Sequence, residues 1–187
     1  ITLLPTLKPT NYDAYVQVII EENVRIVETA GRSPEKIIPI LKKNNIIVIH
    51  KCVSIRHALT AERLGADIIS IDGFECAGHP GPYDTGNWIL LALCKERLKI
   101  PYIVSGGCAT GVQLAAALAF GASCMNMGTR ITATKEAPVH ENIKQALINA
   151  DEHSTKLILR TLNNTERVFK NAAMEKVASI ESKTPGN

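Results

Sequence analysis

The sequence contains few aromatic side chains and no long apolar run. Phe, Trp and Tyr make up 4% of the 187 residues, so the core must be built mainly from Ile, Leu, Val and Ala. No apolar run approaches the length of a membrane span, and no signal peptide is visible. A membrane partner is therefore not expected.

Strong charge of one sign and metal-ligand spacing are also lacking. The formal net charge is +3, and no basic run is longer than a pair such as Lys42 and Lys43. This disfavours nucleic acid as a partner. The five cysteines are odd in number and contain no CxxC pair, which disfavours a disulfide framework or a zinc site. We expect free thiols, no metal and a cytoplasmic location.

Short apolar runs rich in β-branched residues alternate with helical patterns along most of the chain. Hydrophobic residues make up 45% of the sequence and charged residues 21%, as in an ordinary globular protein. Strands are predicted at residues 24–29, 46–52, 68–71, 102–104 and 124–127. Helices are predicted at residues 34–43, 55–64, 87–98 and 111–120. This alternation predicts a parallel α/β sheet with right-handed crossovers.

Capping residues mark the ends of the predicted helices. Ser33 (followed by Pro34), Ser54 and Thr110 stand where a side chain accepts hydrogen bonds at a helix N-terminus. Gly65 and Gly121 follow the last helical residues, where a left-handed glycine commonly ends a helix. Repeated strand–helix units suit a (β/α)8 TIM barrel and a doubly wound sheet equally well.

The two ends of the chain have different patterns. Residues 1–9 read as the end of a sixth strand followed by a proline-bounded loop. Residues 140–150 and 165–181 are predicted helices with no strand between them, and residues 183–187 are a predicted frayed tail. We therefore divide the chain into a barrel portion, residues 1–134, and a helical appendage, residues 135–187.

Two glycine-rich turns follow neighbouring predicted strands. Gly106-Gly107 and Gly128-Thr129 lie at strand carboxyl ends, where sites in parallel α/β folds are found. Glycine lets backbone amides approach a phosphate closely, so the pair predicts a phosphate site, the other interpretation being two plain turns. The sequence has neither a GxGxxG after a strand nor a GxxxxGK[ST], which disfavours a dinucleotide site or a P-loop.

His79 lies in a Gly/Pro-rich loop after another predicted strand. Its local chemistry allows two interpretations, a loop histidine near solvent or an acid/base or anion-binding group. Lys51, directly after an apolar strand, points either to the barrel mouth or to solvent, and Asp72 is a site residue or a loop cap. Cys76 and Cys108 are weak candidates for a thiol nucleophile, because no base is placed for either.

Three motifs in order resemble the nitronate monooxygenase (2-nitropropane dioxygenase) family. Residues 72–81 (DGFECAGHPG) resemble its Gly-Gly-His-x-Gly loop. Residues 101–107 (PYIVSGG), Gly111 and residues 115–122 (AAALAFGA) resemble its phosphate-loop strand and helix. Residues 127–130 (MGTR), followed by residues 133–136 (ATKE) and His140, resemble its last strand. The similarity covers nearly the whole chain.

The resemblance implies an FMN-dependent (β/α)8 barrel with an inserted helical region near the C-terminus. It implies that His79 is the active-site histidine beside the flavin ring. The residues implied to contact FMN are Lys51, Asp72, Ala77, Gly78, Gly106, Gly107, Met127, Gly128 and Thr129. The glycine turns hold the phosphate in this assignment, and the first three residues line the flavin. Ala77 stands where the family has the first glycine of its histidine loop.

The implied reaction is oxidation of an alkyl nitronate by FMN and O2 to a carbonyl compound and nitrite. His79 would hydrogen-bond the anionic nitro group or remove a carbon-bound proton from a neutral nitroalkane. Two alternatives remain, an NAD(P)H:quinone or enoyl reductase on the same flavin barrel and a truncated, flavin-free subunit or pseudoenzyme. The family's first two strands are unmatched, so we expect an incomplete barrel that a homo-oligomer or partner chain completes.

Overall fold

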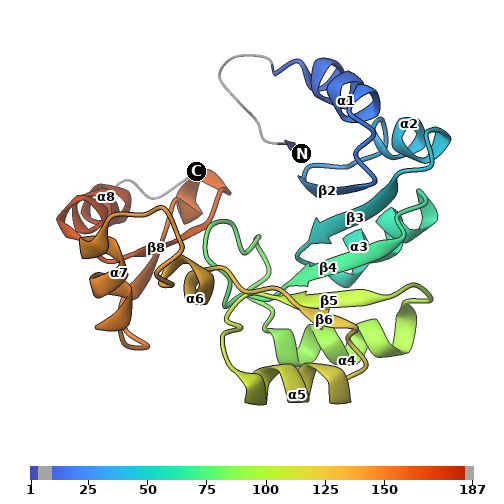
Figure 1. Cartoon of the computed structure of the whole chain (residues 1–187). Coiled ribbons are helices and arrows are strands. Elements are labelled where there is room, and N and C mark those ends of the chain that lie inside the picture. Colours follow the sequence, from blue (N-terminus) through green and yellow to red (C-terminus); the bar gives the residue numbers. More distant parts are fainter. Residues whose placement is uncertain (4–9, 184–187) are drawn as a thin grey trace.

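The computed structural model describes residues 1–3 and 10–183 and contains a six-stranded parallel sheet (Figure 1). The strands lie side by side in chain order: β1 (Thr2–Leu3), β2 (Ile26–Gly31), β3 (Ile47–Cys52), β4 (Ile68–Asp72), β5 (Tyr102–Ser105) and β6 (Cys124–Met125). This confirms the predicted parallel sheet, including its sixth strand at the N-terminus. The predicted loop over residues 4–9 lies outside the described residues.

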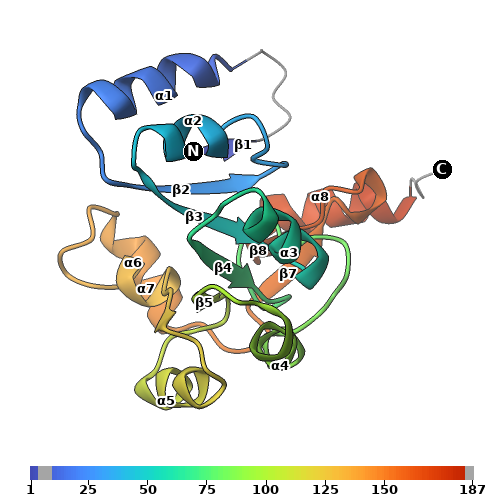
Figure 2. The same ribbon diagram turned by 90° about the vertical axis from the view of Figure 1, so that its right-hand side faces the viewer.

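Helices connect these strands on one side of the sheet. They are α1 (Tyr12–Glu21), α2 (Ile38–Lys43), α3 (Ile55–Arg63), α4 (Asn87–Arg97) and α5 (Gly111–Ala119), and the short α6 (Thr129–Thr132) follows β6. Consecutive strands are neighbours, and right-handed crossovers then place every connecting helix on the same face. Helix α3 accordingly packs on β3 and β4, and α4 on β4 and β5 (Figure 2).

Branched aliphatic side chains fill the layer between the sheet and its helices. Ile38 and Leu41 of α2, together with Val48, Ile69 and Ile71 of the sheet, have no measurable exposure. Fully burying one such side chain is worth about 1.5–3 kcal/mol. The core is therefore aliphatic, as the low aromatic content predicts.

Two of the three predicted N-caps are confirmed. Ser54 accepts a hydrogen bond from the His57 amide, and Thr110 accepts one from the Gln113 amide in a reciprocal capping box. The Ser33 cap is wrong, because α2 begins only at Ile38 and has no side-chain cap. The Pro34 carbonyl instead accepts the amides of residues 37 and 38, so a turn precedes the helix.

The appendage contains a β-hairpin as well as helices. It comprises α7 (Glu141–Ile148), β7 (Thr155–Ile158), the 3-10 turn η1 (Arg160–Leu162), β8 (Glu166–Phe169) and α8 (Ala172–Lys183). The prediction of a purely helical appendage is wrong, because residues 166–169 pair antiparallel with β7 and the helix begins only at Ala172. Residues 184–187 of the predicted tail lie outside the described part of the chain.

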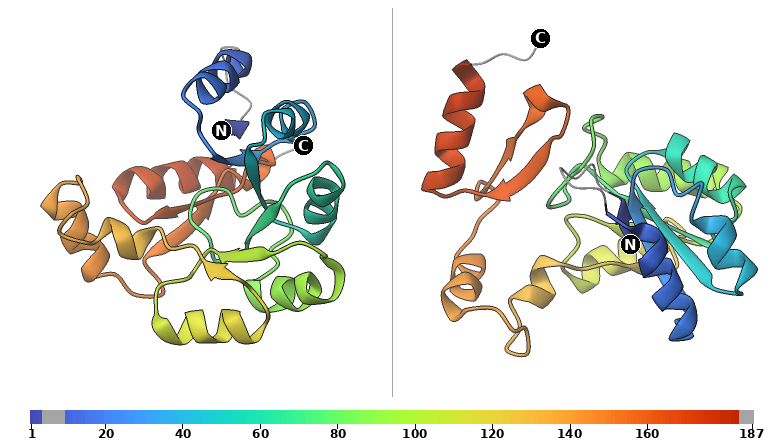
Figure 3. Two further views of the ribbon diagram at one scale, coloured as in Figure 1. Left: turned by 45° about the vertical axis from the view of Figure 1, so that its right-hand side comes forward. Right: turned by 90° about the horizontal axis from the view of Figure 1, so that it is seen from above.

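The sheet and the appendage meet beyond the carboxyl ends of the strands (Figures 1 and 3). The loop after β4 forms an isolated bridge with β8, joining Gly78 to Arg167. At the sides of the sheet, β1 pairs only with β2 and β6 only with β5 within the described residues, so two edges remain open. Within the same residues, no helix combines the length and apolarity needed to cross a bilayer.

Candidate functional site

A cavity of about 670 Å³ lies beyond the carboxyl ends of β1 to β4. Four of the residues singled out by the sequence line it: Lys51, Asp72, Ala77 and His79. They come from the end of β3, the end of β4 and the loop that follows β4. Parallel strands explain the convergence, since their carboxyl ends meet on one side of the sheet.

His79 is held from the appendage. Its Nδ1 lies 3.2 Å from the carbonyl oxygen of Thr165, the residue before β8. Because a carbonyl oxygen can only accept, this contact requires that Nδ1 carry the proton. Nε2 is then an acceptor in the neutral imidazole and a donor in the imidazolium. The side chain is exposed rather than buried in a core, so Nε2 is open to a ligand in the cavity.

Lys51 and Asp72 place opposite charges on the cavity wall. The Lys51 ammonium lies 3.2 Å from a carboxylate oxygen of Glu28, which also lines the cavity. Burial raises the pKa of the Asp72 carboxyl, against the opposing effects of the Ser105 hydrogen bond and the Lys51 charge. Asp72 Oδ1 is buried with no hydrogen-bond partner among the described residues. A buried oxygen of this kind calls for a partner that the described residues do not supply, such as a water molecule or a bound group.

The first glycine turn has two structural constraints. Gly106 and Gly107 adopt φ angles of +87° and +66°. A Cβ at Gly106 would lie 2.6 Å from Cβ of Cys76, and one at Gly107 would lie 2.7 Å from Cβ of Glu75. These glycines are therefore required by the neighbouring loop as well as by any ligand. Asn87 Nδ2 fixes the turn by donating to the carbonyls of residues 105 and 106, at 3.0 and 2.6 Å.

The second turn has open space in front of it. Gly128 precedes α6, and among the described residues no heavy atom beyond its two chain neighbours lies within 4 Å of the position that its Cβ would take. The amides of Gly106, Gly107, Gly128 and Thr129 all lack a hydrogen-bond partner within the described ranges. Since β5 and β6 are neighbouring strands, free amides gather at adjacent strand ends, an arrangement that fits a phosphate.

The candidate residues form two groups. One is the cavity with His79, and the other is the pair of glycine turns, which lie outside the cavity lining. Met127, between β6 and the second turn, packs against the hydrophobic core and does not line the cavity. A cavity can accept the ring of a nucleotide cofactor and unpaired amides can accept its phosphate, so the two groups could together hold such a cofactor.

Sequence reasoning missed several residues of the site. His50 and His57 both line the cavity, although neither had a pattern that indicated a role. His50 is buried, its Nδ1 lies 2.9 Å from Oγ1 of Thr29, and burial lowers its pKa to about 4. The sequence of β3, IVIHKC, has no alternation of polar and apolar residues, so it contains no signal that His50 is buried. Arg167, whose Nη2 donates to the Phe74 carbonyl at 3.0 Å, has no local signal for this contact, because the two residues lie 93 positions apart in the chain.

The cysteines near the site do not have the properties of nucleophiles. Cys76 is buried, and burial raises the pKa of its thiol to about 12, with the Asp72 charge acting in the same direction. Burial also raises the pKa of the Cys108 thiol. A thiol nucleophile acts as thiolate, so these surroundings oppose covalent catalysis by either residue.

A family model described as "Nitronate monooxygenase" matches residues 3–187. A curated relative from Rhodococcus jostii (strain RHA1), named "(3aS,4S,5R,7aS)-5-hydroxy-7a-methyl-1-oxo-octahydro-1H-indene-4-carboxyl-CoA dehydrogenase", is 35% identical over 129 residues, 69% of this chain and 36% of the relative. A "Nitronate monooxygenase" from Paraburkholderia phytofirmans (strain DSM 17436 / LMG 22146 / PsJN) is 32% identical over 143 residues, 72% of this chain and 39% of the relative.

Among solved structures, FabK from Thermotoga maritima superposes with a TM-score of 0.90 at 33% identity. The match covers 99% of this chain and 58% of FabK. The chain therefore spans well under two thirds of the length of these relatives. The six strands and their helices correspond to part of a TIM barrel of this type.

Proposed function

The chain belongs to the nitronate monooxygenase family of flavin oxidoreductases, and from that premise we propose FMN-dependent oxidation of alkyl nitronates by O2. The products are a carbonyl compound and nitrite. The observation that carries the proposal is the position of His79, in a cavity at the strand ends with Nδ1 bound to a carbonyl. An imidazole held in this way offers one defined nitrogen to a substrate.

His79 has two roles in this proposal. With both nitrogens protonated, Nε2–H donates to the anionic nitro group of a nitronate and orients it. With Nε2 unprotonated, the same atom removes a carbon-bound proton from a neutral nitroalkane. General acid–base catalysis of this kind contributes roughly 10²–10⁴-fold. The flavin supplies the redox chemistry when bound.

The remaining candidate residues bind and orient the cofactor. The phosphate is held by the free amides of Gly106, Gly107, Gly128 and Thr129. The open space at Gly128 lets the phosphate reach them. Lys51 lines the flavin as a hydrogen-bond donor, and Asp72 lines it through its unpartnered Oδ1. Ala77, Gly78 and Met127 complete the set of residues proposed around the cofactor.

A second candidate is reduction of an activated acyl substrate or a quinone at the expense of NAD(P)H. The similarity to a carboxyl-CoA dehydrogenase and the TM-score of 0.90 to FabK favour it. Both candidates need the same flavin site, and they differ in the substrate that meets His79. Direct comparison of substrates is therefore the decisive assay.

The experiment begins with the visible absorption spectrum of the purified protein and the mass of any released cofactor. We expect flavin bands and FMN, followed by nitrite production from an alkyl nitronate. Turnover of NADH with a quinone or an enoyl thioester, without nitronate oxidation, would establish the second candidate instead. A protein that takes up no flavin even after FMN is added contradicts both and favours the flavin-free subunit.

A further inference from the structure

The hairpin β7–β8 forms hydrogen bonds with the loop that carries His79. The Arg167 amide donates to the Gly78 carbonyl at 2.6 Å, and the Gly78 amide donates to the Arg167 carbonyl at 3.1 Å. Two residues earlier, the Thr165 carbonyl accepts from Nδ1 of His79. Strand β8 thus pairs with Gly78, and Thr165, the residue before the strand, contacts the candidate catalytic group.

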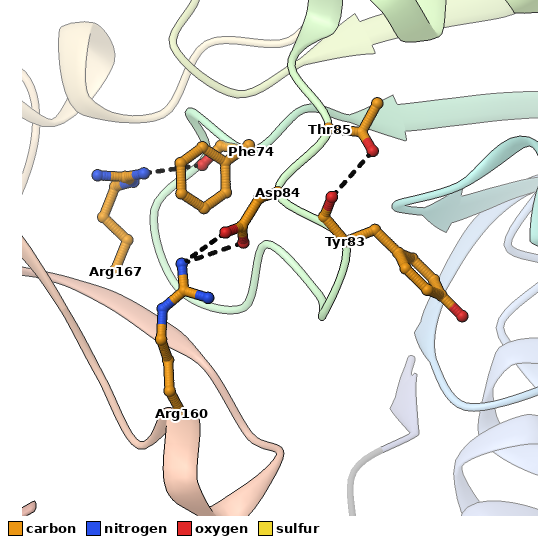
Figure 4. A network of polar contacts seen from close by, with 6 residues as sticks. All are labelled: Phe74, Tyr83, Asp84, Thr85, Arg160 and Arg167. Atoms are coloured by element: carbon orange, nitrogen blue, oxygen red, sulfur yellow. Dashed lines mark hydrogen bonds and ion pairs between the residues drawn. The ribbon is translucent and has the colours of Figure 1, made fainter.

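The side chain of Arg167 fixes the other end of the same loop (Figure 4). Its Nη2 donates to the Phe74 carbonyl at 3.0 Å, and its guanidinium carbon lies 4.9 Å from the centroid of the Phe74 ring. Nη1 donates to Oγ1 of Thr155 on β7 at 3.1 Å, and this hydrogen bond orients the guanidinium from the neighbouring strand of the hairpin. One residue therefore binds the loop at position 74 with its side chain and at position 78 with its backbone.

The surroundings of Arg167 differ from those of the other arginine at this interface. Arg160 contacts Asp84 at 2.9 and 3.0 Å, but both side chains are exposed, so the pair is of the kind that contributes little. Nε of Arg167 is buried without a hydrogen-bond partner in the described part of the chain. Burying an unpaired donor costs free energy. The contacts of Arg167 with Phe74 and Thr155 offset this cost, and the contact with Phe74 exists only while the loop keeps this conformation.

We propose that Arg167 is a positioning residue for His79. By holding the loop at Phe74 and Gly78, it keeps Nδ1 of His79 against the Thr165 carbonyl. The imidazole then stays in the Nδ1–H tautomer, because the tautomer is set by the hydrogen bond that the other nitrogen makes. Nε2 remains the nitrogen available to substrate. The effect of Arg167 on turnover rests on the proposed function, whereas its effect on the tautomer of His79 does not.

The test uses Arg167→Met, which keeps most of the side-chain volume and removes the guanidinium. Lys156→Met is the matched control, since Lys156 lies on the same hairpin and pairs with Glu175 of α8 rather than with the loop. Nitrogen NMR of protein labelled with ¹⁵N-histidine reports the tautomer of each histidine. The signal that disappears in His79→Gln is assigned to His79. Flavin content and nitronate turnover are measured on the same samples.

We expect His79 to occupy the Nδ1–H tautomer in the wild type and in the control. In Arg167→Met we expect a mixture of both tautomers, with turnover lowered about tenfold or more at unchanged flavin content, because small displacements of a reacting group are costly. A folded Arg167→Met protein with the wild-type tautomer overturns the proposal. If that variant does not fold, Arg167→Lys replaces it, with an intermediate mixture expected and a wild-type tautomer again contradicting the role.

The two proposals fail in different ways. If the wild type binds flavin and has no nitronate turnover, while Arg167→Met still changes the tautomer, the proposed reaction is wrong and the positioning role stands. If turnover is present and the tautomer of His79 is insensitive to Arg167, the reaction stands and the positioning role is wrong.

Discussion

The Nδ1 atom of His79 lies 3.2 Å from the carbonyl oxygen of Thr165, although 86 positions separate the two residues. One belongs to the loop after β4 and the other to the appendage. The candidate site is therefore built by both parts of the chain. Removing residues 135–187 as an accessory segment would free Nδ1 of the imidazole from the carbonyl that fixes it.

Replacing His79 with Ala is expected to lower nitronate turnover at least about tenfold while leaving FMN binding unchanged. The variant removes the acid/base nitrogen but none of the free amides proposed for the phosphate. Steady-state turnover and flavin absorbance measure the two effects separately. His153→Ala, which removes an exposed histidine that does not line the cavity, is the control and should keep its turnover. Equal activity of His79→Ala and wild type would remove His79 from the mechanism.

Replacing Gly128 with Ala is expected to weaken FMN binding without affecting folding. Beyond the two chain neighbours, no atom of the described residues lies within 4 Å of the new methyl group, and the φ angle of −97° is open to any residue. The methyl would instead occupy space in front of the free amides, with a loss of affinity on the order of tenfold. Flavin titration measures the affinity for FMN, and thermal unfolding measures whether folding is affected. An unchanged dissociation constant would show that the phosphate binds elsewhere.

Acid is expected to destabilise the fold through His50. Burial lowers the pKa of this imidazole from 6.5 to about 4, and the neighbouring His57 adds to the effect. Between those pH values the unfolded chain binds a proton that the folded chain does not, so the free energy of unfolding falls as pH decreases. The loss from this group is at most about 3 kcal/mol.

Urea unfolding at several pH values between 7 and 4 measures this loss. His50→Gln should show a flatter dependence on pH than the wild type. The control is His153→Gln, because His153 is exposed and is not part of the hydrophobic core cluster. A pH dependence that is identical in His50→Gln and wild type would assign the acid sensitivity to other groups.

Thiol labelling is expected to follow burial. Cys124 is exposed, whereas Cys52, Cys76 and Cys94 are buried and their thiol pKa values are raised to about 12 by burial. Iodoacetamide near neutral pH should therefore modify Cys124 first and the other three only on unfolding. Peptide mass spectrometry identifies the modified sites. Rapid labelling of Cys76 in the folded protein would restore it as a candidate nucleophile.

Local sequence signals predicted the sheet and most of its connections. Ser54, Thr110, Gly65 and Gly121 mark helix ends through bonds and conformations within a few residues, which sequence patterns capture. Helix α1 was not anticipated, although Asn11 caps it by accepting from the Ala14 amide. The sequence also indicated which strand ends form the cavity wall, since the carboxyl ends of the strands converge in any parallel sheet.

The hairpin could not be predicted in the same way. Its strands have four residues each, and the sequence of β8 runs into a good helix-forming segment. Its conformation depends on the bridge to Gly78 and on the contact of Arg167 with Phe74, both of which join distant parts of the chain. Tertiary contacts therefore overrode local helical preference there.

The close approach of Gly106 to Cys76 limits how this site can be redesigned. The backbone N and Cα of Cys76, as well as its Cβ, lie 2.6 to 3.0 Å from the position that a Cβ at residue 106 would take, so no change of side chain at position 76 makes room for one. The wall between the glycine turn and the histidine loop therefore keeps glycine at position 106, whichever side chain stands at position 76. Single substitutions that reshape the site belong at Ala77, which is exposed, or at Gly128, which faces open space.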